Sequence, residues 1–171
     1  MKFNPHPSQE RLRELFEYRD NNTQPFLWNK NRRNNIKIGD VAGGIHAASG
    51  YYRVAINKKQ YKLHRLVWIY HNGDIPNGMF VDHIDGDPSN NRIENLRLAT
   101  NEQNLRNSKI SPKNTSGVKG VSWDKSRKKW KAQIRTNYKI KSVGRFDTIE
   151  EAEAAMITAR NNLHGDFARH E

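Results

Sequence analysis

The chain of 171 residues contains no cysteine, and this absence removes several classes of function at once. Disulfide-stabilised folds, thiolate zinc sites and cysteine nucleophiles all require that residue. No apolar run approaches the roughly 18 to 20 residues of a membrane span, and the N-terminus has no signal-peptide core. These absences predict a cytoplasmic protein with no membrane partner.

Apolar residues are also scarce: they make up 35% of the chain, and the mean hydropathy is −1.00. Such a composition favours small ordered modules joined by polar linkers over one large core. Changes in pattern along the chain predict four segments. They are a helix with a strand-rich leader (1–60), a compact module (61–108), a basic linker (109–117) and a second module (118–171).

Acidic residues are nearly missing from one block of the sequence. Residues 106–146 hold thirteen of the 30 Lys and Arg residues but only one of the 18 Asp and Glu residues, Asp124, so the rest of the chain carries 17 of each. A charge run is often only a solvated surface. Charge this one-sided, with aromatic residues interleaved, instead predicts binding to a polyanion such as nucleic acid.

The local pattern before residue 81 indicates mixed secondary structure. Ser8 is a plausible N-cap for a short amphipathic helix, and the run 26–62 is strand-like with a hairpin at "NKK". "HRLVWIYHNG" has the apolar spacing of a helix that Gly73 would end. His64 in this stretch is predicted to be a packed or hydrogen-bonded helix residue rather than a site residue.

The run "VDHIDGDPSNNRIENLRLAT" (81–100) places many polar groups inside an apolar frame. Its pattern predicts a strand, a polar loop, a second strand and then a helix capped by Thr100. The Asx-rich loop could be purely structural. Asp82 and His83 are neighbours on the first strand, so they can share a site only where that strand ends or bends.

The residue types in this run suit phosphodiester chemistry. Asp82 and Asn104 offer hard oxygen ligands of the kind that magnesium prefers. His83 has a side chain that can take a proton from water near neutral pH. An asparagine such as Asn95 can fix the orientation and tautomer of that imidazole, although neighbouring loop asparagines, Asn90 and Asn91, compete for this role.

"HRLVWIYHNGDIPNGMFVDHIDGDPSNNRIENLRLATNEQN" resembles the HNH nucleases of phage homing endonucleases. The resemblance implies a small ββα-metal module with His83 as general base and Asn95 as the residue that orients it. It further implies Asp82 and Asn104 as ligands of one divalent metal, Mg²⁺ or Mn²⁺. The chain has Asn at the last motif position, where the family name has His.

The basic block reads as a three-stranded sheet followed by a helix. "KGVSW", "KWKAQIRT" and "KIKSVGRF" are the strand candidates, and Trp123 and Trp130 are expected in the core. Lys131, Gln133 and Arg135 alternate with apolar residues, so they would line the exposed face of the sheet. Such a face can enter the DNA major groove.

"SGVKGVSWDKSRKKWKAQIRTNYKIKSVGRFDTIEEAEAAMITARNNLHG" resembles the Apetala-type (ethylene-response-factor) DNA-binding domain. The resemblance implies DNA contacts from the basic positions of its sheet, namely Arg127, Lys129, Lys131, Arg135, Lys141 and Arg145. The leader adds further candidates for DNA contact, namely Arg53, Lys58, Lys59 and Lys62.

Together these patterns predict an α+β protein with a small ββα-metal nuclease module, followed by a three-stranded antiparallel sheet packed on one helix. The predicted activity is that of a metal-dependent endonuclease that nicks double-stranded DNA as a monomer, with no small-molecule cofactor. If a phage encodes it, its place is the host cytoplasm. A non-catalytic DNA-binding regulator with a degenerate module is the alternative. RNA binding is disfavoured because the tryptophans are expected in the core.

Overall fold

The chain folds into two units, Met1–Ala99 and Thr100–Glu171, and each unit is described by itself. The structure is a computed structural model that describes residues 6–21, 23–30, 36–107, 110–136, 138–164 and 167–168. The division falls inside the predicted 61–108 module, whose last helix belongs to the second unit. The predicted segment bounds stay predictions, and Lys109, the first residue of the predicted linker, lies outside the described residues.

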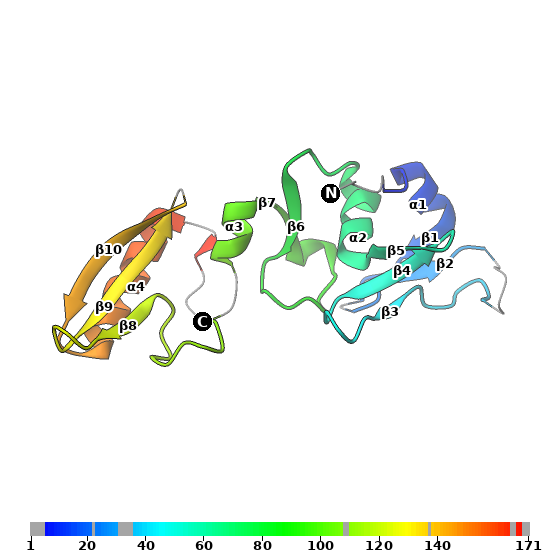
Figure 1. Ribbon diagram of the computed structural model, residues 1–171. Helices are drawn as coiled ribbons and strands as arrows, with labels where there is room; N and C mark the ends of the chain where they lie inside the picture. Colours follow the sequence, from blue (N-terminus) through cyan, green and yellow to red (C-terminus); the bar gives the residue numbers. More distant parts are fainter. Residues whose placement is uncertain are drawn as a thin grey trace. The chain divides into compact units, whose positions relative to one another are not determined.

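The first unit combines short strands with two helices (Figure 1). β1 pairs antiparallel with β2, β3–β4–β5 form an antiparallel sheet, and β6 pairs with β7. Its elements are α1 (Gln9–Leu15), β1 (Phe16–Tyr18), β2 (Phe26–Trp28), β3 (Gly44–Ile45), β4 (Tyr52–Ile56), β5 (Lys59–Lys62), α2 (Leu63–Asn72), β6 (Met79–His83), the 3₁₀ helix η1 (Ile93–Asn95) and β7 (Leu96–Thr100).

Local sequence signals account for the boundaries of these elements. Ser8 caps α1 by accepting a hydrogen bond from the Arg11 amide at 3.2 Å, as predicted. The predicted β4–β5 hairpin turns at Asn57 and Lys58, which both have positive φ, as a tight two-residue hairpin requires. Gly73, with φ of 80°, ends α2 as predicted.

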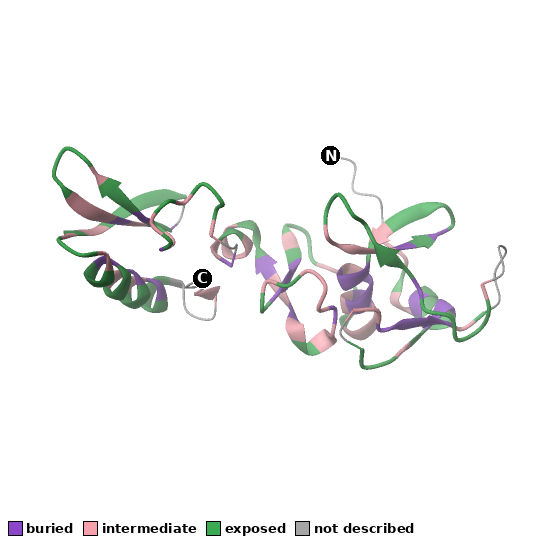
Figure 2. Ribbon diagram, turned by 90° about the horizontal axis from the view of Figure 1, so that it is seen from below, coloured by how far each residue is buried: buried purple, intermediate pink, exposed green. Residues whose placement is uncertain are grey.

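Helix α2 lies between the β6–β7 pair and the β3–β4–β5 sheet, and its buried face is the centre of the first core (Figures 1 and 2). Leu63, Leu66 and Val67 are fully buried there, together with Phe16 and Phe26, whose rings stack at 4.8 Å. This core holds the first turn of α2, which contains His64, against the end of β6 at His83.

The second unit is an antiparallel sheet of order β10–β9–β8 with α4 packed against it (Figure 1). The predicted α+β fold, with a three-stranded sheet on one helix, is confirmed. Its elements are α3 (Asn101–Arg106), β8 (Val121–Asp124), β9 (Lys129–Thr136), β10 (Lys139–Phe146) and α4 (Ile149–His164).

The core of the second unit joins the inner face of β8 and β9 to α4. Its buried residues are Val118, Val121, Ala132, Ile134, Ala152 and Met156. Gly120 (φ 77°) brings the backbone against this core, where a Cβ would lie 2.6 Å from the Gln133 carbonyl oxygen and 2.8 Å from the Met156 methyl carbon. Only glycine fits there without a shift of neighbouring atoms.

Candidate active site and nucleic-acid interface

The polar segment between β6 and β7 begins where β6 ends. Asp82 and His83 are the last two residues of β6, and they expose only 7% and 5% of their surface. Past His83 the chain turns, and the Ile84 amide bonds the Asn95 carbonyl at 2.8 Å. The strand end therefore lets two neighbouring polar residues both be buried, although residues along a regular strand alternate between its faces.

His83 contacts Asn91 across the loop. The His83 Nε2 atom lies 3.3 Å from Asn91 Oδ1, and Asn91 is fully buried. The Asn91 Nδ2 group donates to the carbonyls of Thr23 and Ser89, at 2.8 and 3.1 Å. Because carbonyls only accept, these two bonds fix the amide with its oxygen toward the imidazole.

This orientation decides the tautomer of His83. Since Asn91 Oδ1 can only accept, Nε2 carries the proton in the neutral ring, and Nδ1 is the nitrogen that can accept a proton. Burial lowers the pKa of His83 below its ordinary value, while the Asn91 hydrogen bond and nearby carboxylates, Asp85 first among them, oppose the shift. The imidazole is thus in its basic, neutral form at neutral pH.

Asn95, predicted from family spacing to orient His83, makes other contacts. Its side chain accepts from the Asp85 amide at 3.1 Å and donates to Asp85 Oδ1 and the Asn90 carbonyl, at 2.9 and 2.8 Å. It thus holds the loop together, and the contact with the imidazole belongs to Asn91. The turns of this compact loop, rather than the spacing along the sequence, decide which asparagine contacts the imidazole.

Asp82 pairs with Arg97, a residue that the sequence reasoning missed. Arg97 Nε lies 3.2 Å from Asp82 Oδ2, and the two side chains are only 16% and 7% exposed. A buried carboxylate needs such a partner because an unpaired buried charge is costly. A carboxylate has about four lone-pair sites, so an Asp paired with arginine keeps the chemistry of a hard metal ligand.

Asn104, the other predicted metal ligand, lies on α3 in the second unit. Thr100 and Gln103 form the predicted capping box that starts this helix directly after β7. The described residues contain no group of three or more His, Cys, Asp or Glu side chains able to hold a metal. A metal at Asp82 would accordingly need amide, water or phosphate oxygens to complete its shell.

Two further rings surround His83. The His64 ring packs edge to face on it with centroids 4.8 Å apart, and Tyr51 lies 5.3 Å from His64 and 6.1 Å from His83. His64 is buried, as the sequence reasoning expected of a packed helix residue. Burial, and next to it His83, holds the pKa of His64 well below its ordinary value, so His64 is uncharged.

The four basic residues of the leader that are predicted to contact DNA lie at different positions of the β4–β5 hairpin. Arg53 and Lys62 are opposite each other on β4 and β5, and the Lys62 ammonium sits 4.0 Å from the Tyr51 ring centre. Lys59 is opposite the buried Ile56, so the register puts it on the other face, and Lys58 lies in the turn. Burial and then the charge of Arg65 lower the pKa of Lys62.

The outer face of the β8–β10 sheet carries the predicted basic row only in part. Lys129, Lys131 and Arg135 alternate with helix-facing residues on β9, and Arg145 pairs with Lys131 in register. Lys141 instead pairs with Ile134, a core residue, so it lies on the helix side of the sheet. The strand register shifts between Ser142 and Gly144, and the extra residue reverses the alternation.

Two acidic residues restrain this basic face. Arg145 Nε pairs with Asp124 Oδ2 at 3.1 Å, and Lys129 Nζ lies 3.0 Å from Asp147 Oδ1. Hydrogen bonds from Ser126, followed by Arg145, lower the pKa of Asp124 to about 2, so it is ionised at any working pH. Arg127 lies in the β8–β9 turn, where its amide bonds the same carboxylate.

The expectation that both tryptophans belong to the core is half right. Trp130 packs against the second core, whereas Trp123 is 45% exposed and meets Trp130 edge to face at 5.1 Å. The two are opposite each other in register, on the helix side of the sheet. Trp123 is at the margin of the core, and neither of these two tryptophans lies on the basic face of the sheet.

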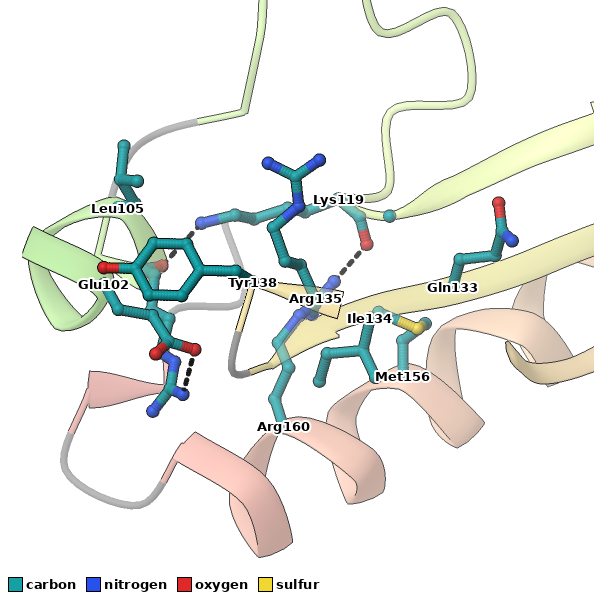
Figure 3. Close-up of a pocket in the computed structure, with 11 residues that line it drawn as sticks. Glu102, Leu105, Lys119, Gln133, Ile134, Arg135, Tyr138, Met156 and Arg160 are labelled. Atoms are coloured by element: carbon teal, nitrogen blue, oxygen red, sulfur yellow. Dashed lines mark hydrogen bonds and ion pairs between the residues drawn. The ribbon is translucent and has the colours of Figure 1, made fainter. Parts of the chain in front are cut away.

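The second unit also contains a pocket of about 240 Å³ between α3, β9 and α4 (Figure 3). Three of its cations serve the fold: Lys119 donates to the Arg106 carbonyl, Arg160 donates to the Lys119 carbonyl, and Arg106 pairs with Glu102 at 2.6 Å. None of its lining residues comes from the segment 81–98. The pocket therefore lies within the second unit, between α3 and the sheet.

Comparison with protein families gives two matches in the chain. The HNH endonuclease family matches residues 61–106, and the AP2 domain matches residues 116–166. A comparison with the solved structures found no match. Within the described residues, every helix is too short or too polar to cross a membrane.

Three of the curated relatives come from phages or a prophage. Protein 3.8 of Escherichia phage T7 is 42% identical over 106 residues, which cover 62% of this chain and 87% of that protein. The SPbeta prophage-derived putative HNH homing endonuclease YosQ of Bacillus subtilis (strain 168) is 46% identical over 32% of each chain. The DNA endonuclease I-HmuI of Bacillus phage SP01 is 39% identical over 42% of this chain and 44% of its own length. The chain thus spans less than half of the latter two relatives.

Proposed function

Because the chain belongs to the HNH endonuclease family and carries a C-terminal AP2 domain, we propose that it is a divalent-metal-dependent endonuclease that nicks double-stranded DNA. The observation that carries this proposal is the buried His83–Asn91 pair beside Asp82. A fold needs no neutral imidazole with a fixed tautomer next to a carboxylate, but a hydrolytic site does.

His83 is the general base of the proposed reaction. Its Nδ1 takes a proton from water while the water oxygen forms a bond to phosphorus. The bond from phosphorus to the 3′-oxygen breaks, and that oxygen takes a proton from solvent. The products are a 5′-phosphate and a 3′-hydroxyl. Asn91 keeps Nε2 protonated throughout, so Nδ1 is always the nitrogen presented to water.

Asp82 and Asn104 are the proposed metal ligands. Their carboxylate and amide oxygens are hard donors that suit Mg²⁺ or Mn²⁺, and the charge of Asp82 is already compensated by Arg97 at 3.2 Å. One divalent cation held by this pair would supply charge stabilisation for the leaving 3′-oxygen. The two side chains come from the end of β6 and from α3.

The outer face of the second unit's sheet is the proposed DNA-binding surface. Lys129, Lys131, Arg135 and Arg145 share that face in register, whereas Lys141 does not. Asp124 holds Arg145 through Nε, and the terminal amino groups of this guanidinium are the donors proposed to contact a base or phosphate. Arg53 and Lys62 are the corresponding candidates of the first unit.

One HNH match per chain supports nicking by a monomer, because each such module cuts one strand. The phage origin of the relatives supports action in the cytoplasm of a host cell. No small-molecule cofactor is needed for hydrolysis of this kind.

The test uses supercoiled plasmid carrying DNA of the source replicon, incubated with Mg²⁺ or with EDTA. Wild type, His83→Ala and His46→Ala are compared, since His46 is an exposed histidine of the same unit that contacts Ser49. We expect open circles from wild type and His46→Ala with Mg²⁺ only, and none from His83→Ala. Tight DNA binding without cleavage under any divalent metal would instead support the regulator alternative.

A further inference from the structure

His64 is buried at a position where its chemistry is not used by the fold. It stands in the first turn of α2, exposes only 4% of its surface, and its Nδ1 atom is buried without a hydrogen-bond partner. An unpartnered buried nitrogen costs stability, which an apolar side chain of similar size would avoid. A histidine here therefore needs a reason other than packing.

The contact that supplies this reason is the one with His83. The His64 ring meets the His83 ring edge to face, with centroids 4.8 Å apart and an interplanar angle of 65°. A second constraint on the His83 ring is the hydrogen bond between its Nε2 atom and Asn91, at 3.3 Å. The hydrogen bond fixes one atom of the imidazole, and a flat neighbour against the ring restrains rotation about that bond.

We propose that His64 is a positioning residue that holds the His83 ring in the plane in which Nδ1 faces the attacking water. This inference rests on the proposed function of His83. The ring of Tyr51, the residue just before β4, packs against the His64 ring with centroids 5.3 Å apart. Because His64 is neutral in its buried position, it can pack against His83 without repelling the charge that His83 gains during proton transfer.

The chain offers a matched control in the same helix. His71 also has a buried ring nitrogen without a partner, Nε2, and packs edge to face on an aromatic ring, that of Tyr18, at 4.4 Å. Its ring contacts are with Tyr18 and Tyr70. His64→Leu and His71→Leu therefore each remove from α2 a ring with one unpartnered nitrogen, although His71 is only half-buried, and only His64→Leu removes a contact with His83.

The experiment measures plasmid nicking, thermal melting and the ¹⁵N spectrum of the His83 ring in the full-length chain. We expect His64→Leu to keep or raise the melting temperature but to slow nicking roughly tenfold or more, because small displacements of a reacting group are costly. The ¹⁵N signals of the His83 ring should shift and broaden as the ring loses its packing partner, while the Nε2–H tautomer that Asn91 fixes is kept. His71→Leu should nick within about twofold of wild type and leave those signals unchanged.

A second variant keeps the test decisive. His64→Phe retains a flat ring, so it should restore most of the rate that His64→Leu loses; if this larger ring lowers the melting temperature, the leucine variant and the spectrum decide. Wild-type rate and an unchanged His83 spectrum in His64→Leu would overturn the proposal. If wild type itself cuts no DNA, the proposed function fails, while the His83 spectrum still tests the positioning role.

Discussion

Removal of the Asn91 side chain tests the arrangement around His83 most directly. Asn91→Ala deletes three hydrogen bonds, to the carbonyls of Thr23 and Ser89 and to His83 Nε2, from a residue that is fully buried. At about 0.5–1.5 kcal/mol of net stability each, the loss sums to about 2–4 kcal/mol. For a unit of this size that lowers the melting temperature by roughly 10–25 °C.

The loss of nicking activity should exceed what the loss of stability explains, and Asn95→Ala is the control that separates the two effects. Asn95 also makes three hydrogen bonds, but to Asp85 and Asn90 instead of His83. Both variants are assayed for nicking of supercoiled plasmid at a temperature well below the lower melting point. We expect Asn91→Ala to be about 10–100-fold slower than Asn95→Ala, because only the former frees the tautomer of the base.

The outcome that refutes this reasoning is specific. If Asn95→Ala slows nicking as much as Asn91→Ala while both remain folded, the loop as a whole supports catalysis and Asn91 has no separate role. If Asn95→Ala alone is inactive, the spacing argument from the sequence was the better guide to the orienting residue.

Three further predictions follow from buried charge and from strand register. Arg97→Met removes the Arg97 partner of the buried Asp82 carboxylate and should destabilise the first unit by about 3–5 kcal/mol. Mg²⁺ should raise the melting temperature of this variant more than that of wild type, as differential scanning calorimetry would reveal, and an equal response would argue against a metal at Asp82. Lys131→Ala should weaken DNA binding and reduce the slope of log K against log salt by about one. Lys141→Ala should have a smaller effect, because Lys141 lies on the helix side of the sheet. Equal effects of the two substitutions in fluorescence titrations would contradict the register argument. Burial holds the pKa of His64 well below its ordinary 6.5, so below pH 6.5 the unfolded chain binds a proton that the folded chain does not. The stability that this group contributes is therefore full above pH 6.5 and declines as the pH falls below it. Melting curves from pH 7.5 to 5 should show a shallower decline for His64→Leu than for wild type, and an unchanged decline would refute the assignment.

Elements with strong local signals could be predicted from the sequence. The Ser8 cap, the hairpin at Asn57, the Gly73 stop and the box of Thr100 with Gln103 are all set by residues within one turn of the boundary. Such signals do not depend on distant contacts. The register shift at Val143 shows the limit, because one inserted residue reverses which face every later side chain occupies.

The sequence could suggest the chemistry of the candidate site but could not suggest its contacts. Asp82 and His83 stand out because the sequence places a carboxylate and an imidazole together at a strand end. Arg97 does not, because its partner is fixed by how β6 pairs with β7 across a loop of twelve residues, 84–95. Likewise, spacing along the chain could not select Asn91, whose return to His83 depends on the turns that Gly86 and Asp87 impose.

The two units divide two kinds of charge between them. The first unit holds buried, individually paired groups, such as Asp82 with Arg97 and His83 with Asn91, which bulk ions screen little. The whole excess of positive charge lies in 106–146, within the second unit and largely exposed. Since salt competes with exposed cations for phosphate and screens buried pairs much less, ionic strength acts mainly on how tightly DNA is held.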